Sequence, residues 1–165
     1  MADGHRRLSG GEVKLLRSVF ADRIAFHKVR IVDGFGLSPV AAIALRQPHA
    51  DAITLRRTIF FGRHHVSDFA VAKPGLQALL VHEMTHVWQW TELGAASFLA
   101  RYLREFAACG WNAKAMYRYA PREPFESARL EAQAQMVQDY YLARAFGKPR
   151  DDLGASLAGS GAYGL

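Results

Sequence analysis

Hydrophobic residues recur at helical spacing near the start of the chain. Between residues 9 and 24 the large apolar side chains lie three or four positions apart, which is the spacing of one face of an amphipathic helix. Ser9 precedes this series and is a suitable N-cap. Val29 and Ile31 then alternate with basic residues before a glycine-containing turn, so we expect a short strand there.

Residues 52–61 carry the clearest strand pattern, because β-branched and aromatic side chains predominate. In one continuous strand, Ile53 and Ile59 would share the buried face, while Thr54 and Thr58 would lie on the opposite face. We therefore predict a single strand over 52–61, with Thr54 among its outward-facing polar residues.

The rest of the chain has helical patterns bounded by proline and glycine. A helix should begin at Pro74 and end before Gly94, and residues 95–119 should be helical in one or two pieces. A last helix is expected between residues 124 and 147. Residues 154–165 are mostly Gly, Ala and Ser, so we predict one domain over 1–153 followed by a flexible tail over 154–165.

Composition restricts the class of protein. Of the 165 residues 50% are hydrophobic and 22% charged, as in an ordinary globular domain. No apolar stretch approaches the roughly 18 residues of a membrane-spanning helix, and the basic first residues are not followed by the apolar segment of a signal peptide. We therefore expect a cytoplasmic protein, with non-classical export left open.

The positive charge of the chain does not by itself indicate a nucleic-acid partner. The net charge is +6 and the pI about 9.8, but the Lys and Arg residues are scattered rather than grouped into a basic stripe. A solvated basic surface explains this pattern. The single cysteine, Cys109, excludes an internal disulfide.

The segment His82-Glu83-Met84-Thr85-His86 has the H-E-x-x-H pattern. Four residues make slightly more than one helical turn, so both imidazoles project from one face and can bind one metal ion. Glu83 lies about 100° around the helix from His82, where it can act as a general base toward a metal-bound water. The alternative is a pair of hydrogen-bonded core histidines next to a surface glutamate.

A catalytic zinc ion usually takes three protein ligands, so a third must come from elsewhere in the chain. The metzincin subtype is excluded, because Gln89 and Glu92 stand where it requires glycine and histidine. Glu131 is our predicted third ligand, since the small residues around it, Ala128, Ala132 and Ala134, would allow two helices to approach closely. Glu126 is the second choice. Gln135, one turn after Glu131, could orient a histidine ligand.

Other polar residues are weaker candidates. Asp139 could support the site from the far part of the last helix, and the hydroxyl of Tyr117 or Tyr119 could stabilise an oxyanion. His64 and His65 precede the motif helix, where exposed loop histidines are the simpler interpretation. The spacing of these residues does not select among them.

These motifs resemble the gluzincin branch of the zincin metallopeptidases. The stretches 54–61, 68–70, 79–89, 131–135 and 139–141 are also similar to small bacterial Vgr-related proteins, some of which are encoded near type VI secretion components. The resemblance implies an α+β fold: a minimal zincin-like domain with a short antiparallel sheet on the central HExxH helix and further C-terminal helices. It also implies that His82, His86 and Glu131 bind one Zn²⁺ ion. Gln135 departs from the acidic residue that gluzincins commonly have there.

The sequence therefore predicts a zinc metallopeptidase that hydrolyses peptide bonds, with Glu83 as the base and a peptide or protein as substrate. By analogy, residues 54–60 would line the cleft as an edge strand and pair with the substrate. The alternative is a catalytically idle protein of the same fold that acts as an accessory of a bacterial secretion system. An intact Glu83 favours the enzyme, because a structural zinc site has no use for a base.

Overall fold

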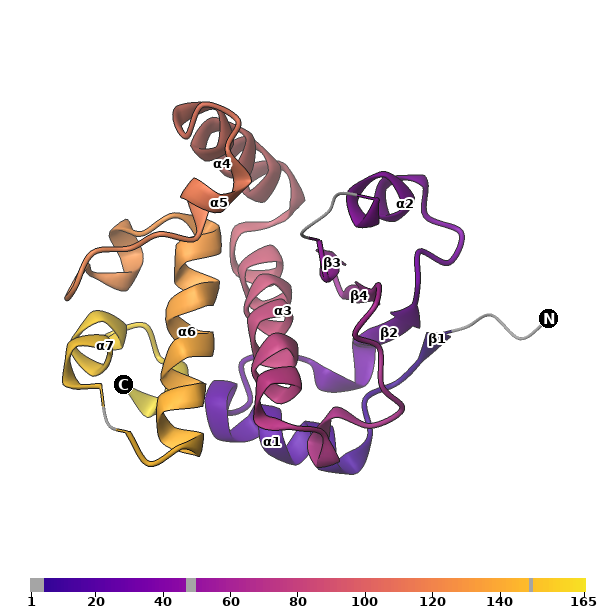
Figure 1. Ribbon diagram of the computed structural model, residues 1–165, viewed down its shortest axis with the longest axis horizontal. Helices are drawn as coiled ribbons and strands as arrows, with labels where there is room; N and C mark the ends of the chain where they lie inside the picture. Colours follow the sequence, from indigo (N-terminus) through magenta and orange to yellow (C-terminus); the bar gives the residue numbers. More distant parts are fainter. Residues whose placement is uncertain (1–4, 47–49, 149) are drawn as a thin grey trace.

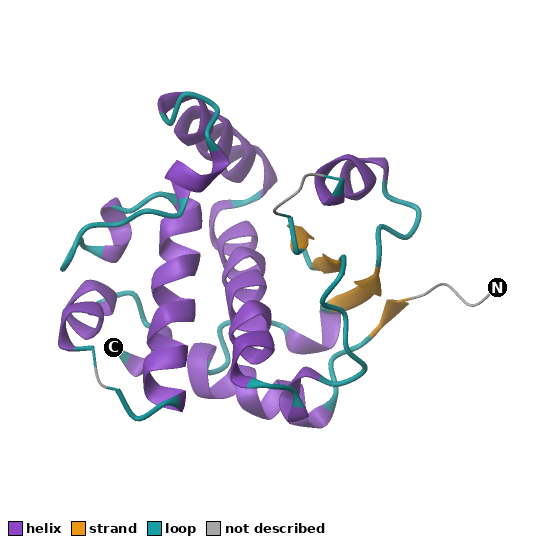
Figure 2. Ribbon diagram, viewed as in Figure 1, coloured by secondary structure: helices purple, strands orange, loops and turns teal. Residues whose placement is uncertain are grey.

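A computed structural model describes residues 5–46, 50–148 and 150–165. Within these residues four short strands form one mixed sheet beside the helices (Figures 1 and 2). They are β1 (His5–Arg6), β2 (Arg30–Asp33), β3 (Ala52–Leu55) and β4 (Thr58–Phe61), in the order β1-β2-β4-β3. β2 and β4 are parallel, whereas the other pairs are antiparallel. The expected antiparallel sheet is therefore wrong. The second strand of the β3–β4 hairpin, β4, pairs with β2 and runs in the same direction as β2.

Residues 52–61 form a hairpin and not the single strand that the alternating pattern predicted. The chain reverses at Arg56, whose φ of 58° lies in the left-handed region. Thr54 consequently pairs with Ile59 across the hairpin, and directly opposed residues of an antiparallel pair project to the same face. Thr54 is 6% exposed and Ile59 is fully buried, so the expected outward orientation of Thr54 is also wrong.

The helix α3 (Pro74–Leu93) lies at the centre of the molecule, between the sheet and α6 (Leu130–Ala145) (Figure 1). α3 begins at Pro74, as expected, and ends at Gly94, whose φ is 75°. Every residue from Leu80 to Trp90 is buried. Polar side chains within this stretch therefore need partners inside the protein.

Most of the remaining helices lie around this central pair, whereas α2 lies beyond it, next to β3 (Figures 1 and 2). Residues 95–119 form two helices separated by a turn, and the predicted last helix is shorter than expected because a 3₁₀ turn over Phe125–Ser127 precedes α6. The helices besides α3 and α6 are α1 (Gly10–Phe20), α2 (Pro39–Leu45), α4 (Ala95–Ala108), α5 (Ala113–Met116) and α7 (Asp151–Leu157). Further 3₁₀ turns are η1 (Phe26–Lys28), η2 (Phe69–Val71) and η4 (Ala162–Gly164).

A fully buried carboxylate joins α1 to the start of the sheet and to η2. Both oxygens of Glu12 accept from the guanidinium of Arg6, at 2.7 and 2.8 Å. The backbone N–H groups of Ser9 and Phe69 donate to the same carboxylate at 2.8 and 2.9 Å. Ser9 caps α1, as predicted, by accepting from the N–H of Glu12. Four donors thus compensate the burial of this charge.

The C-terminal segment is folded, so the expected flexible tail over 154–165 is wrong. Leu153 and Leu157 are fully buried, and Ala162 is 1% exposed. The hydroxyl of Tyr163 donates to the carbonyl of Val137 on α6. Apolar residues at helical spacing within a Gly/Ala/Ser background are sufficient here to bury one face.

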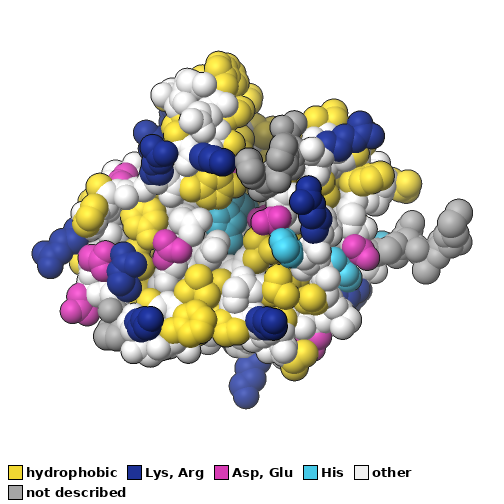
Figure 3. Space-filling view, in the orientation of Figure 1, with side chains coloured by type: hydrophobic (Ala, Val, Ile, Leu, Met, Phe, Trp, Pro, Cys, Tyr) yellow, Lys and Arg dark blue, Asp and Glu magenta, His cyan; other side chains and the backbone are white. Residues whose placement is uncertain are grey.

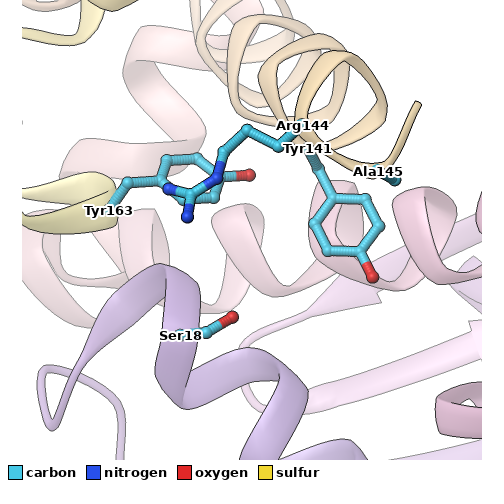
Figure 4. Close-up of a pocket in the computed structure, with 5 residues that line it drawn as sticks. All are labelled: Ser18, Tyr141, Arg144, Ala145 and Tyr163. Atoms are coloured by element: carbon cyan, nitrogen blue, oxygen red, sulfur yellow. The ribbon is translucent and has the colours of Figure 1, made fainter. Parts of the chain in front are cut away.

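A pocket of about 230 Å³ lies where this C-terminal segment meets α1 and α6 (Figure 4). It is lined by Ser18, Tyr141, Arg144, Ala145 and Tyr163. The guanidinium of Arg144 lies 5.4 Å from the centre of the Tyr163 ring. The pocket therefore lies between α6 and the C-terminal residues that pack against it. Among the described residues, we find no helix with both the length and the apolar character required to cross a bilayer.

Candidate metal centre

The two histidines of the HExxH motif lie one turn apart on α3 and point to the same place. Nε2 of His82 lies 3.2 Å from Nε2 of His86. Their side chains are only 5% and 8% exposed, because α3 is covered by β3 on one side and by α6 on the other. The spacing of the motif thus produces the convergence expected of it.

Glu131 completes this cluster from α6. Its Oε2 lies 3.3 Å from Nε2 of His82 and 3.2 Å from Nε2 of His86. Three ligands at zinc-binding distances around a tetrahedral ion are separated by about 3.3 Å. The three atoms therefore already have the spacing of one face of a tetrahedral metal site, and the donor set fits a divalent ion such as zinc.

A proton can also hold these three atoms together when no metal is bound. Burial lowers the pKa of His86, but the Glu131 carboxylate outweighs burial and raises the pKa to about 9. Burial raises the pKa of Glu131, whereas His86 and His82 lower it well below its ordinary range. The metal-free cluster is therefore an imidazolium–carboxylate pair at neutral pH, whose proton a metal ion would replace.

Glu131 lies in the first turn of α6, not in the middle of a helix as the sequence suggested. The partial positive charge at a helix N-terminus stabilises a carboxylate at that position. Glu105 of α4 fixes this end of α6 by accepting from the N–H of Leu130 at 2.8 Å. Arg101 donates to the carbonyl of Ala128 at 2.7 Å and also pairs with Glu105. The position of Glu131 thus depends on α4 as well as on α6.

Gln89 orients His86, and sequence reasoning did not find it. Oε1 of Gln89 lies 2.8 Å from Nδ1 of His86, so Nδ1 donates the proton and Nε2 is left to face a metal ion. Nε2 of Gln89 donates to the carbonyl of Leu130 and to Oε1 of Gln133. The sequence could have indicated this role, because Gln89 is three residues after His86 in a largely apolar helix, and residues three apart are neighbours on a helix surface. Nδ1 of His82 has no such partner among the described residues.

Gln135, the residue expected to orient a histidine, has other partners in the structure. Its Nε2 donates to Asp139 at 2.8 Å. The hydroxyl of Tyr119 donates to the other oxygen of Asp139 at 2.5 Å. These three residues form a separate cluster further along α6, and the hydrogen bonds described for them do not reach the histidines.

Tyr117 lies at the cluster, whereas the other weak candidates do not. Its ring stacks on that of His82, with centres 5.7 Å apart, and is 39% exposed. Burial and the Glu131 charge raise the pKa of Tyr117, so its hydroxyl remains a donor. The same two causes raise the pKa of Tyr102, which the sequence did not indicate. His64 and His65 instead face Asp51 and Asp33, and Glu126 is exposed.

Glu83 stands beside the three converging atoms without being one of them. It is 5% exposed, and its Oε2 accepts from Oγ1 of Thr54 at 2.7 Å. The carboxylate thus keeps one oxygen outside this hydrogen bond. Histidine side chains reach the surface near the centre of the face shown in Figure 3, below α4 and beside the sheet.

Comparisons with known proteins show similarity to a family model and to a protein of a secretion system. Residues 15–94 match the family model of the eCIS core domain, a range that includes the HExxH motif and ends before Glu131. The chain is 29% identical over 147 residues to the type VI secretion system spike protein VgrG2b of Pseudomonas aeruginosa. That alignment covers 87% of this chain but only 13% of the spike protein.

The similarity extends to a solved structure. The effector domain of Pseudomonas aeruginosa VgrG2b matches with a TM-score of 0.67 at 29% identity, over 93% of this chain and 82% of that one. The expected relationship to Vgr proteins is therefore confirmed, together with the expected α+β class, although the sheet is mixed and not antiparallel. The assignment to the zincins stays a prediction.

Proposed function

We propose that this chain is a metal-dependent peptidase domain that serves as an effector domain associated with a bacterial secretion system. The observation that carries the proposal is the convergence of His82, His86 and Glu131 to within 3.3 Å of one another. A buried cluster of this kind, next to a carboxylate, Glu83, that is not one of the three converging groups, would suit a catalytic metal site.

Zinc is the ion that this donor set favours. Two imidazole nitrogens and one carboxylate oxygen suit zinc better than magnesium or calcium, which prefer oxygen ligands. Only three protein ligands converge among the described residues, so a fourth position would be left for water or substrate. When bound, the ion would supply a water molecule with a pKa near 7 and would polarise a substrate carbonyl.

The side chains around the cluster have matching roles in peptide hydrolysis. Glu83 would take the proton of the attacking water and return it to the leaving amine. The Tyr117 hydroxyl, which remains protonated, would donate to the oxyanion that develops on the carbonyl. β3 is an edge strand beside the site, so an extended peptide could add to the sheet there.

The comparisons support the association with a secretion system more directly than they support hydrolysis. The similar proteins are described as a spike protein and an effector domain. Since the chain spans 13% of the spike protein's length, it corresponds to one part of that protein. A second candidate function is therefore a catalytically idle binding domain of the same apparatus, with a metal site that only stabilises the fold.

A peptide digest combined with a metal assay separates these functions. We expect the purified wild-type protein to bind one zinc ion and to cleave members of a quenched-fluorescent peptide mixture. Glu83→Gln should retain the zinc and lose cleavage, whereas His82→Ala should lose both. Zinc binding without cleavage of any peptide would favour the idle domain, and full cleavage by Glu83→Gln would refute the assigned base.

A further inference from the structure

We infer that Thr54 is a positioning residue that fixes the orientation of the general base Glu83, an inference that rests on the proposed function. Oγ1 of Thr54 lies 2.7 Å from Oε2 of Glu83 and 3.2 Å from the backbone carbonyl of the same residue. A hydroxyl has one proton, and the shorter contact to the charged acceptor is the stronger one. The proton therefore belongs to the side-chain hydrogen bond.

The contact crosses between two elements that are far apart in the sequence. Thr54 lies on β3 and Glu83 on α3, and the two residues are 6% and 5% exposed. The carbonyl of Thr54 accepts from the indole N–H of Trp90, about two turns after Glu83 along α3. Thr54 is thus held against α3 through its backbone and holds Glu83 through its side chain.

This hydrogen bond determines which carboxylate oxygen is available for chemistry. With Oε2 engaged by Thr54, Oε1 is the oxygen that can accept a proton from water. A base must lie within hydrogen-bonding reach of that proton, and a misplacement of about 1 Å can lower a rate roughly 100-fold. The buried hydroxyl of Thr54 is suited to this role, because it can donate its proton to the Glu83 carboxylate.

Isosteric and conservative variants separate this role from a purely structural one. Thr54→Val keeps the shape and removes the hydroxyl, whereas Thr54→Ser keeps the hydroxyl and removes the methyl group. We expect Thr54→Val to lower kcat for a peptide cleaved by the wild type roughly 10- to 100-fold, with KM and zinc content unchanged. Thr54→Ser should restore most of the rate. If Thr54 mattered only through its shape, Thr54→Val would be active and Thr54→Ser impaired.

Thr58→Val is the matched control, because Thr58 lies on β4, which is inside the sheet between β2 and β3 and is not the edge strand that could pair with a peptide; it stands opposite Leu55. It should cleave the peptide at the wild-type rate. If Thr58→Val lowered kcat as much as Thr54→Val, the loss of either threonine hydroxyl of the hairpin would be enough to slow cleavage. That result would overturn the inference.

Crystal structures of the wild-type and Thr54→Val proteins provide a readout that does not depend on activity. In the wild type, the Glu83 carboxylate should accept from Thr54 at less than about 3.2 Å, and in Thr54→Val it should turn away. An unmoved Glu83 in Thr54→Val, or a wild-type Glu83 directed elsewhere, would overturn the inference. Absence of cleavage with the hydrogen bond intact would instead count against the proposed peptidase function.

Discussion

The amide of Gln89 joins the two helices that carry the predicted metal ligands, because its Nε2 donates to Oε1 of Gln133 on α6, 2.9 Å away. Its Oε1 simultaneously holds Nδ1 of His86 on α3. Nε2 of Gln133 continues the chain of hydrogen bonds to the carbonyl of Phe125. One buried network thus sets both the orientation of a histidine and the distance between the helices.

Removal of the Gln89 amide should weaken metal binding without removing a ligand. We expect Gln89→Leu to lower the zinc affinity roughly 10- to 100-fold, as is typical when a residue that orients a histidine ligand is lost. Competition with a chromophoric chelator measures this change. Gln135→Leu is the control: its amide contacts Asp139, so its affinity should match that of the wild type. Equal losses in both variants would contradict the assigned role of Gln89.

The metal-free cluster should stabilise the fold over a defined pH range. The pKa of His86 rises from its ordinary value of 6.5 to about 9, so its contribution is complete below 6.5 and is lost as the pH rises through 9. The pKa of Glu131 is lowered from 4.5, so its contribution is present above 4.5 and is lost in acid.

Thermal unfolding of the chelator-treated protein tests this pH range. Glu131→Gln removes the partner charge of His86, so the wild type should have the higher Tm between about pH 4.5 and 6.5. That difference should shrink as the pH rises through 9. A difference in Tm that stays constant across the range would show that the pair does not ionise as described.

The sequence predicted the motif helix and its ligands because their signals are local. H-E-x-x-H spacing converts directly into two imidazoles on one helical face, and Pro74 and Gly94 mark the ends of α3. Glu131 could be proposed because it falls in a strongly helical segment with small neighbours. The sequence did not show that Glu131 lies in the first turn of α6. The 3₁₀ turn over Phe125–Ser127 follows Pro124 and contains an acidic residue, so it resembles the start of a helix.

Features that depend on tertiary packing were not predicted. The hairpin turn at Arg56 has none of the Gly, Asn, Asp or Pro residues that usually mark such turns, so Thr54 was assigned to the wrong face. Gln89 resembles any polar residue of a helix until α6 is placed beside it. Leu153 and Leu157 were hidden by the Gly, Ala and Ser residues around them.

The C-terminal segment should contribute to stability in proportion to what it buries. Leu153 is fully buried, so Leu153→Ala should lower the free energy of unfolding by about 3 kcal/mol. Chemical denaturation measures the loss. Leu165 is 40% exposed, and Leu165→Ala should change stability by less than about 0.5 kcal/mol. If Leu153→Ala were equally neutral, the segment would not be packed as described.

The Arg6–Glu12 pair, in which the Glu12 side chain is fully buried and the Arg6 side chain is 27% exposed, should contribute more to stability than a fully exposed ion pair. Glu12→Gln leaves Arg6 without its partner charge, and we expect unfolding to become easier by about 3 kcal/mol. Arg17 and Asp22 form a pair at 2.9 Å whose side chains are 58% and 84% exposed. Asp22→Asn should therefore cost less than about 1 kcal/mol. Similar losses in the two variants would contradict the described burial of Glu12.

Anomalous X-ray scattering at the zinc edge, from crystals of the purified protein, tests the metal centre most directly. We predict one peak about 2.1 Å from Nε2 of His82, Nε2 of His86 and Oε2 of Glu131. A peak at any other place, or a zinc-soaked crystal without a peak between these three residues, would contradict the proposed metal site and the hydrolysis that depends on it.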